Sequence, residues 1–426
     1  MFDRRYTADC RIYNMLAAAP RHLSFHTPGH KKGKWDITEL SFSDNLSNPT
    51  GVLKETQTEI AAILGAKRSF LLTDGSTCGV LSMLCAAGIQ KLVFSAAAHK
   101  SVYNGCRLLG IETIVLPVQY AGSVPLQPDP QKIAFALQNA GMEPSRSGKA
   151  EKAAVLLTSP DYYGNIADYA AVRAVCNAYG ALLLCDGAHG GHLHGTPLYA
   201  GKYCDFWVDG VHKSLPAFTQ GAVVSARTEA LGERLAAAAD IFRTTSPSYP
   251  ILASVEYAVR YPRNPRLKKE AEAVKRRLHA RENADWTKIV ICYGKNAFEV
   301  QRGLEAKGIF PEFCDGENIM FYLSPAQPLA QLKKLEKALR GFESLRVEGE
   351  NITPMPAFTA GKRTEKIEWM SLRESAGFTC AGDAGLFPPC LPVVREGQVI
   401  ERKHIEKLSE AKSVYGLLEG KIAVYI

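Results

Sequence analysis

The sequence predicts an α/β fold in which a mainly parallel sheet, covered by helices on both faces, is followed by a smaller α+β unit. Two observations support this prediction. Near-continuous apolar runs recur through the first half of the chain and alternate with helical stretches, which is typical of a buried parallel sheet. After Tyr261, apolar residues at helical spacing begin a different pattern of helices and strands.

The strands predicted in the first half are Ser69–Thr73, Lys91–Ser95, Glu112–Pro117, Ala153–Ser159, Ala181–Asp186, Asp205–Asp209 and Gly221–Ala226. Helices are predicted between several of these strands, for example over Gly79–Ala87 and Tyr169–Tyr179. The segment Gly141–Lys152 is polar and contains Gly, Ser and Pro residues, so it is predicted to be a surface loop.

The second half begins with a helix predicted from apolar residues at spacings of four, three and four, namely Leu267, Ala271, Val274 and Leu278. The elements predicted after this helix alternate between strands and helices. They are the strand Lys288–Cys292, the helix Ala297–Lys307, the strand Ile319–Leu323 and the helix Leu329–Phe342. This order predicts a smaller α+β unit.

The composition is that of an ordinary globular protein. The chain has 426 residues, of which 46% are hydrophobic and 22% are charged, so a disordered or collagen-like chain is excluded. No apolar stretch approaches the ~20 residues that cross a bilayer, and no secretory signal follows Met1. The eleven cysteines include no C-x-x-C pair, which argues against a disulfide framework and a zinc ribbon. We therefore expect a cytoplasmic protein with reduced thiols and no membrane partner.

The positive charge does not by itself identify a partner. The formal net charge is +8, and the stretch Tyr261–Val290 holds nine Lys and Arg against four Asp and Glu, so it supplies +5 of the total. Its basic residues mostly avoid the apolar stripe of the predicted helix, which indicates a solvated helix face. No aromatic-interleaved basic patch accompanies them, so no nucleic-acid partner is expected.

The candidate site residues lie where the predicted strands end, because ligands of an open parallel sheet bind outside the carboxyl ends of its strands. These strand ends carry Thr73–Thr77, His99–Ser101, Ser159–Asp161, Asp186–His189 and Gly210–Lys213. Together they hold a Gly-Ser-Thr turn before a helix, one buried acid, a lysine and a histidine. These are the parts that a site for pyridoxal 5′-phosphate requires.

Each part has a chemical reason. The turn Gly75–Thr77 precedes a helix predicted over Cys78–Ala87, whose free N–H groups suit a phosphate. Asp186, at the end of a buried strand, can keep a pyridine nitrogen protonated, and Lys213 can form a Schiff base. Two histidines complete the predicted contacts: His99, flat on the ring, and His189, at the ring hydroxyl.

Each of these features also has a purely structural explanation. A Gly-Ser-Thr turn is often only a helix N-cap, an acid at a strand end can cap the next helix, a single lysine is usually a surface residue, and His99 can satisfy local backbone groups. The cofactor site is favoured because all of these features follow successive strands of one sheet. A metal-dependent hydrolase that uses Asp186, His189, His192 and His194 is an alternative. These residues lead into a glycine-rich turn without an H-E-x-x-H helix, so no metal site is expected.

These strand ends resemble those of the Orn/Lys/Arg decarboxylases, fold type I enzymes that use pyridoxal phosphate. The resemblance is carried by Thr27–Gly33, Asp36–Leu40, Asp74–Thr77, His99–Val102, Ser159–Gly164, Asp186–Leu193, His212–Gln220 and, more weakly, Leu386–Pro392. The Asp-x-Ala-His sequence that begins at Asp186 and the pair His212-Lys213 are its most specific parts.

The resemblance implies an aspartate-aminotransferase-like large domain with a mostly parallel seven-stranded sheet, and a smaller C-terminal α+β domain. The expected boundaries are 1–50 for an N-terminal arm that contributes to the dimer and the site, 51–262 for the cofactor domain and 263–426 for the small domain. We expect a short form of the family without the N-terminal wing domain. A homodimer or higher homo-oligomer, with sites at the subunit interface, is also implied.

The strand ends and the resemblance together predict the roles of the site residues. The predicted catalytic residues are Lys213 as the Schiff-base lysine, Asp186 at the pyridinium nitrogen, His99 on the ring and His212. The predicted cofactor contacts are Gly75, Ser76, Thr77, His99, Ser159, Asp186, His189, His212 and Lys213. The residues predicted to contact the substrate are His30, Asp161, Tyr163 and Asp383.

The expected reaction is decarboxylation of a basic amino acid, arginine, lysine or ornithine, to the corresponding amine of the polyamine pathway. Lys213 or His212 would return a proton to the α-carbon. Two alternatives remain: an aminotransferase or lyase on the same fold, and a degenerate relative that binds the cofactor or an amino acid for regulation. Three departures from the family pattern bear on activity: Gly210 replaces a serine, Ala96–Ala98 lack an arginine, and Cys390 interrupts the C-terminal motif.

Overall fold

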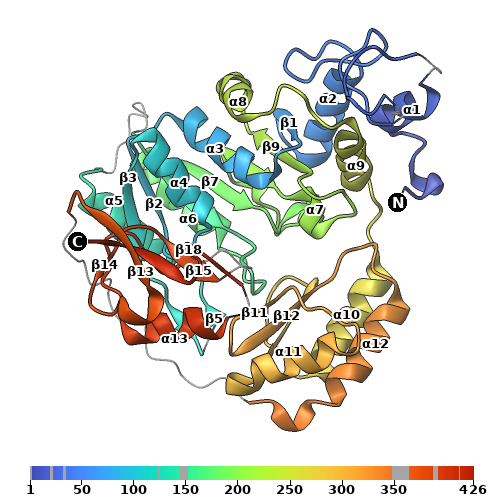
Figure 1. The fold of residues 1–426 in the computed structure, drawn as a ribbon. Helices are drawn as coiled ribbons and strands as arrows, with labels where there is room; N and C mark the ends of the chain where they lie inside the picture. The colour runs from blue at the N-terminus through green and yellow to red at the C-terminus, as the bar shows by residue number, and fades with distance from the viewer. Residues whose placement is uncertain are drawn as a thin grey trace.

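The predicted α/β fold is confirmed. The computed structural model of the chain describes residues 2–19, 23–31, 35–122, 124–143, 152–347, 364–386, 392–411 and 413–426. A seven-stranded sheet with the strand order β1-β9-β8-β7-β6-β2-β3 lies between two layers of helices (Figure 1). The pairings are parallel except those of β9, which runs antiparallel to β1 and β8.

The strands of this sheet are β1 (Arg68–Leu72), β2 (Lys91–Ser95), β3 (Glu112–Leu116), β6 (Ala153–Thr158), β7 (Leu182–Gly187), β8 (Phe206–Asp209) and β9 (Ala222–Ala226). They match the seven predicted strands to within one residue at each end. A short hairpin, β4 (Tyr120–Ala121) and β5 (Val124–Pro125), follows β3.

The alternation of side chains along the strands explains the two helix layers. In β6, Ala154 and Leu156 face one hydrophobic cluster, whereas Val155 and Leu157 face another, because successive residues point to opposite sides of a sheet. The first layer contains α3 (Gly75–Ala87), α4 (Lys100–Leu109) and α8 (Glu229–Phe242). The second contains α2 (Val52–Leu64), α5 (Pro130–Asn139), α6 (Tyr169–Tyr179) and α9 (Tyr249–Val259).

Helix α3 begins three residues earlier than Cys78, where it was predicted to start. Gly75–Thr77 therefore form its first turn and do not precede it. Gly75 adopts a φ of +75°, a conformation that residues with a side chain rarely adopt. The short helix α7 (Val211–Ser214) carries Lys213 directly after β8.

The segment after α9 forms a second layered unit, coloured yellow to orange in Figure 1. Its sheet has the order β10-β12-β11, and helices cover one face. Ile289 and Ile291 face these helices, so Lys288 and Val290 face the other side, toward the large sheet. The elements are α10 (Pro265–Arg277), β10 (Lys288–Cys292), α11 (Ala297–Glu305), β11 (Phe313–Cys314), β12 (Asn318–Tyr322) and α12 (Leu329–Arg340).

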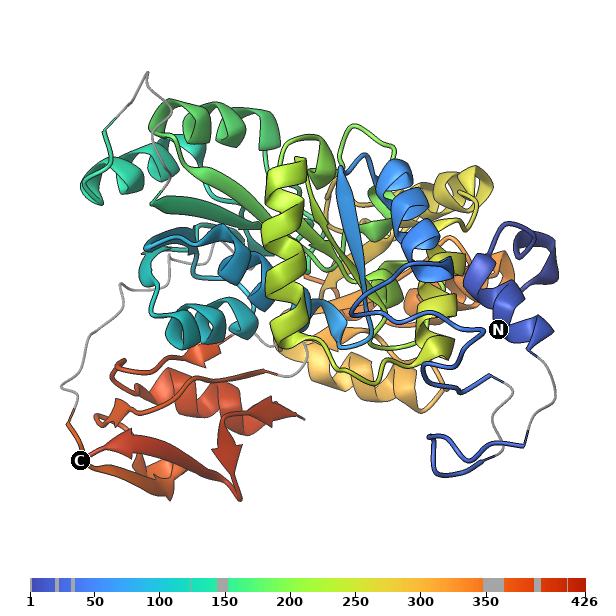
Figure 2. The ribbon, with the colours of Figure 1, turned by 90° about the horizontal axis from the view of Figure 1, so that it is seen from above.

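The last segment folds around a hydrophobic cluster of its own, separate from the cluster under α10. Figure 2 shows this red unit apart from the orange one. The expected small domain over 263–426 thus contains two packing units, and the domain boundaries stay predictions. The elements of the last unit are β13 (Ile367–Ser371), β14 (Thr379–Cys380), β15 (Ala384–Leu386), β16 (Pro392–Val394), α13 (Arg402–Glu410), β17 (Val414–Tyr415), β18 (Leu417–Leu418) and β19 (Lys421–Tyr425).

Some features named from the sequence lie outside the described residues. These are Cys390 with most of the weaker C-terminal motif, the end of the Thr27–Gly33 segment, and most of the predicted loop Gly141–Lys152. Among the described helices, none combines the length and the apolar character that a membrane-crossing segment needs.

Helix α1 (Arg11–Ala18) is fixed to α9 by a buried carboxylate. Glu256 is 0% exposed. It accepts hydrogen bonds from the N–H groups of Arg11 at 2.6 Å and Ile12 at 2.8 Å, which have no partner within the helix because they belong to its first turn. The hydroxyl of Thr56 donates to the same carboxylate at 3.3 Å. Glu256 therefore holds the N-terminal segment against the large sheet unit.

We expect Glu256→Ala to lower the free energy of unfolding by about 2–4 kcal/mol, because it leaves buried amides without an acceptor and creates a cavity. Urea denaturation measures this change. Glu272→Ala on the exposed face of α10 is the matched control and should change stability by less than about 0.5 kcal/mol. A loss at Glu256 no larger than that of the control would contradict this role.

Candidate active site

Three neighbouring parallel strands bring the predicted residues to one edge of the large sheet. Thr158 of β6 is in register with Asp186 of β7, and Asp186 is in register with Val208 of β8. The segments that follow β6, β7 and β8 carry Ser159, His189 and Lys213, and they therefore meet at this edge.

Lys213 and His189 face each other at this edge. Nζ of Lys213 lies 3.4 Å from Nε2 of His189 and 5.6 Å from the centre of the Tyr162 ring. Burial and the positive charges of Lys288 and Lys213 hold the pKa of His189 well below its usual value. A neutral His189 can accept a hydrogen bond from the Lys213 ammonium through Nε2.

Two tyrosines enclose His189. The ring of Tyr322, from β12, stacks on the imidazole at 5.3 Å with 17° between the planes, and its hydroxyl donates to the His189 carbonyl oxygen at 3.1 Å. The Tyr162 ring meets the imidazole edge-on at 4.4 Å. The sequence alone assigns no role to either tyrosine. Tyr322 could have been recognised from the alternation of side chains along the strand. This alternation places Tyr322 on the same strand face as Met320, away from the helices.

Asp186 is buried close to Lys213. It is 3% exposed, and its Oδ1 accepts a hydrogen bond from the N–H of Ala188 at 3.2 Å. Burial raises the pKa of Asp186, and the charge of Lys213 acts in the opposite direction. A second positive group beside this carboxylate would therefore stabilise its ionised form.

His99 caps helix α4. Its Nδ1 accepts a hydrogen bond from the N–H of Ser101 at 3.2 Å and lies 2.8 Å from the Ser101 hydroxyl. Burial, with the charges of Lys213 and Lys100, lowers the pKa of His99 to about 3. The ring is neutral and fixed in orientation. It satisfies local backbone groups, as its structural explanation predicts, and its stacking role stays a prediction.

The first turn of α3 has amide groups available for an anion. The N–H of Gly75 donates to the carbonyl oxygen of Gln220 at 2.9 Å, so this amide is used within the protein. The N–H groups of Ser76 and Thr77 belong to the first turn of the helix and have no acceptor within it. Binding of a phosphate here stays a prediction.

His212 and Ser159 each use a polar atom to bind backbone groups. Nδ1 of His212 lies 3.0 Å from the carbonyl oxygen of Gly221. Because a carbonyl oxygen only accepts hydrogen bonds, Nδ1 carries a proton and Nε2 of the neutral ring is left as an acceptor. The hydroxyl oxygen of Ser159 accepts from the N–H of Ala167 at 3.0 Å. This bond leaves the hydroxyl hydrogen of Ser159 free to donate, and the predicted cofactor contact of Ser159 stays a prediction.

The four residues predicted to contact the substrate come from three parts of the chain. Asp161 and Tyr163 follow β6, whereas Asp383 lies just before β15 and His30 lies on the N-terminal arm. The carboxylate of Asp161 accepts from the N–H groups of Tyr163 and Asn165, both at 2.9 Å, and burial raises its pKa. The carboxylate of Asp161 therefore already accepts hydrogen bonds from the turn that follows it. Contacts of the substrate with these residues stay predictions.

A buried ion cluster joins the small sheet to this edge. Lys288 of β10 has a side chain that is 0% exposed and lies 3.5 Å from Oδ2 of Asp285, which is equally buried. Lys288 also donates to the carbonyl oxygen of Asp161 at 2.6 Å. Burial acts to raise the pKa of Asp285, but His192 and Lys288 outweigh it and hold this pKa below its usual value. Lys288 and Asp285 follow the helix to which the solvated face was assigned, and both of their side chains are buried.

The residues of the metal-site alternative are engaged separately. His192 pairs with Asp285 at 2.9 Å, and Nδ1 of His194 lies 2.7 Å from the carbonyl oxygen of Gly191. In the described ranges, no three His, Cys, Asp or Glu side chains are grouped so that they could hold a metal ion.

The C-terminal unit contacts the loop that precedes α4. Arg395 donates a hydrogen bond to the carbonyl oxygen of Ala96. Its guanidinium lies 4.8 Å from the centre of the Tyr103 ring. Glu396 pairs with Arg107 of α4 at 2.6 Å. An arginine thus reaches the loop in which the family pattern expects one, but it comes from a distant segment.

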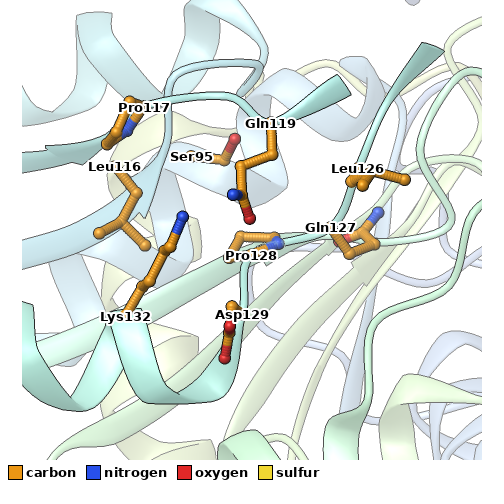
Figure 3. A pocket seen from close by; sticks show the side chains of 9 residues that line it. All are labelled: Ser95, Leu116, Pro117, Gln119, Leu126, Gln127, Pro128, Asp129 and Lys132. Atoms are coloured by element: carbon orange, nitrogen blue, oxygen red, sulfur yellow. The ribbon is translucent and has the colours of Figure 1, made fainter. Parts of the chain in front are cut away.

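A small hollow lies beyond the ends of β2 and β3, and Figure 3 shows Gln119 and Lys132 pointing into it. Its lining is Ser95, Leu116, Pro117, Gln119, Leu126, Gln127, Pro128, Asp129 and Lys132. None of these is a predicted site residue. The Gln127 amide donates to the carbonyl oxygen of Thr158 at 3.1 Å, so the hollow borders the site edge without containing its lysine or buried acid.

One family model matches most of the chain. The sequence model for "Orn/Lys/Arg decarboxylase, major domain" matches residues 12–292. The uncharacterized protein YaaO of Bacillus subtilis is 28% identical, over 94% of this chain and 93% of its own. An arginine decarboxylase of the same organism is 23% identical, over 91% of this chain and 90% of its own. The structure of the Escherichia coli constitutive lysine decarboxylase is similar in fold, with a TM-score of 0.73 at 16% identity, over 97% of this chain and 81% of that chain.

We expect the ligand-free protein to lose stability as the pH falls below about 6.5, because His189 stays neutral in the folded state while the unfolded chain takes up a proton. Its lowered pKa means that this stability is present above the unfolded pKa and is lost toward acid. The slope from one such histidine is up to about 1.4 kcal/mol per pH unit. Urea denaturation from about pH 6.5 to about pH 4.5 should therefore give a shallower slope for His189→Gln.

His279→Asn, which changes an exposed ring, is the control and should follow the wild-type slope. If His189→Gln also followed that slope, His189 would not be the neutral buried group described above.

Proposed function

The chain belongs to the Orn/Lys/Arg decarboxylase family, and we propose that it decarboxylates a basic amino acid, arginine, lysine or ornithine, to the corresponding amine. Its cofactor is pyridoxal 5′-phosphate. When bound, this cofactor supplies a sink for the electron pair that the departing CO2 leaves behind. The observation that carries the proposal is the convergence of Lys213, His189 and Asp186 at one edge of the sheet.

The residues at this edge fit the cofactor. Lys213 would supply the amine that attaches its aldehyde group. Asp186, whose ionised form is disfavoured by burial, would gain from a protonated ring nitrogen. Nδ1 of His189 is buried and has no hydrogen-bond partner within the described ranges, which leaves it available to a polar atom of the ring. Ser76 and Thr77 would hold the phosphate through the start of α3.

We propose Lys213, and not His212, as the proton donor to the α-carbon. Loss of CO2 leaves an electron pair at this carbon, and a side chain has to deliver a proton to it. The proton on Nδ1 of His212 is bound to the carbonyl oxygen of Gly221, which leaves no donor on the neutral ring. The Lys213 ammonium carries several protons and lies beside Nε2 of His189.

We further propose a homodimer or larger homo-oligomer that completes its sites at the subunit interface. The N-terminal arm exposes Leu23 and Phe25 to 85% and 89%, and apolar side chains exposed to this degree favour association. The cysteines of the described ranges are free thiols, which supports a reducing, cytoplasmic location. The amine product supports a place in polyamine biosynthesis.

Lys213→Ala should remove an absorbance band near ~420 nm that the purified wild-type protein shows. It should also slow CO2 release by about 10³-fold or more, because no other amine replaces the lysine. The assay uses a panel of lysine, arginine and ornithine, with the amines identified by mass spectrometry. Lys202→Ala, at an exposed lysine, is the control and should keep both signals.

An active protein without a bound chromophore would contradict the proposed cofactor chemistry. A chromophore without CO2 release from any of the three amino acids would favour the regulatory alternative, and a keto acid among the products would favour transamination.

A further inference from the structure

Arg243 is a buried arginine with unused hydrogen-bonding capacity. It follows the last residue of α8, and its side chain is 5% exposed. Its Nη2 lies 3.7 Å from Oδ1 of Asp240. Its Nε and Nη1 are buried and have no hydrogen-bond partner in the part of the chain that the structure describes. Buried polar nitrogens are nearly always paired because leaving them unpaired is costly, so these two atoms are available to a further acceptor.

The residue after Arg243 is bound to the N-terminal end of α3. The N–H of Thr244 donates to Oδ2 of Asp74, the N-cap residue of α3, at 3.4 Å. Asp74 and Cys78, one turn apart on α3, both act electrostatically on Arg243. Helices α3 and α8 pack against each other (Figure 1). The end of α8 therefore places Arg243 beside the first turn of α3, where the phosphate of the cofactor is proposed to bind.

The chain also lacks one hydroxyl near Lys213 that the resemblance leads us to expect. The family pattern expects a serine three residues before Lys213, where this chain has Gly210. A Cβ atom at Gly210 would lie 2.5 Å from the carbonyl oxygen of Ala188, which is closer than real Cβ contacts. No serine fits at this position without a shift of the backbone, so the phosphate lacks one hydroxyl donor.

We infer that Arg243 binds the phosphate group of the cofactor together with the first turn of α3, in place of the hydroxyl that Gly210 excludes. This inference rests on the proposed function, which makes pyridoxal phosphate the ligand. Guanidinium N–H groups match phosphate oxygens well. The carboxylates of Asp74 and Asp240 lie near the same guanidinium, so Arg243 also offsets their repulsion of a phosphate dianion.

The test compares pyridoxal phosphate with pyridoxal, which has the same ring and aldehyde without the phosphate. Both are titrated into the cofactor-free full-length protein, and the Schiff-base absorbance gives each dissociation constant. Arg243→Met should weaken pyridoxal phosphate binding by about 10- to 100-fold and should change pyridoxal binding by less than about twofold. Arg243→Lys keeps a positive charge but loses the planar guanidinium group. Its affinity for pyridoxal phosphate should lie between those of the wild-type protein and Arg243→Met. Arg266→Met, at an exposed arginine of α10, is the control for the substitution.

Unchanged pyridoxal phosphate affinity in Arg243→Met, or an equal loss for both ligands, would overturn the role of Arg243. Thermal unfolding without ligand checks that each variant is folded. If Arg243→Met does not fold, a selective loss of pyridoxal phosphate affinity in Arg243→Lys supports the inference, and equal losses overturn it. Failure of the wild-type protein to form a chromophore with either ligand would instead overturn the proposed cofactor, and the role of Arg243 with it.

Discussion

Lys288 and Asp285, a buried ion pair of the small unit, hold the small sheet against the edge of the large one through Asp161 and His192. Both side chains of the pair are 0% exposed, and removing one partner of such a pair costs about 3–5 kcal/mol because the other charge stays buried. Lys288 is in register with Tyr322 across β10 and β12 and lies 5.1 Å from the centre of its ring. Lys288, which docks this sheet by its bond to the carbonyl oxygen of Asp161, therefore also helps to place Tyr322 on His189. The ring environment of the site depends on a contact between two units that are far apart in the chain.

The same cluster determines the charge of the site. Lys213 contributes to the lowered pKa values of His99 and His189, and Lys288 also acts on His189. Both imidazoles are therefore neutral between positive groups, and Asp186 is the acid that the structure buries beside Lys213. Lys288 is paired with Asp285, so Lys213 is the positive group at this edge that favours anionic groups such as a phosphate and an α-carboxylate. The chemistry proposed for the chain needs both.

Sequence patterns predicted the large sheet because its strands are continuous apolar runs that need no tertiary information. They could not predict β14, β17 and β18, since two-residue strands have no measurable periodicity. The candidate site was predictable where its residues follow a parallel strand, as Asp186 and Lys213 do. Tyr322 and Arg395 follow no such rule, because they reach the site only through contacts between units that the sequence does not place relative to one another.

Burial of charge was the other property that the sequence did not reveal. Lys288 lies in a basic stretch whose helix is solvated, yet alternation along β10 turns it toward the large sheet. An arginine at the end of an amphipathic helix is usually a surface residue, yet Arg243 is enclosed between α8 and α3. A charged residue is buried only where a partner offsets its desolvation, and that partner is visible only once the fold has brought it near.

The departures from the family pattern relocate polar groups and do not simply remove them. Gly210 is required because the carbonyl oxygen of Ala188 occupies the space of a side chain, and Arg243 stands with unpaired nitrogens near the same phosphate region. The loop of Ala96–Ala98 lacks its own arginine, and Arg395 of the C-terminal unit binds that loop instead. Arg395 is an observed donor from a segment remote in sequence, and Arg243 is the one that we infer. A site can therefore stay intact although single positions depart from the family pattern. What the site requires is a hydrogen-bond donor at a given position in space, and any segment of the chain can supply it.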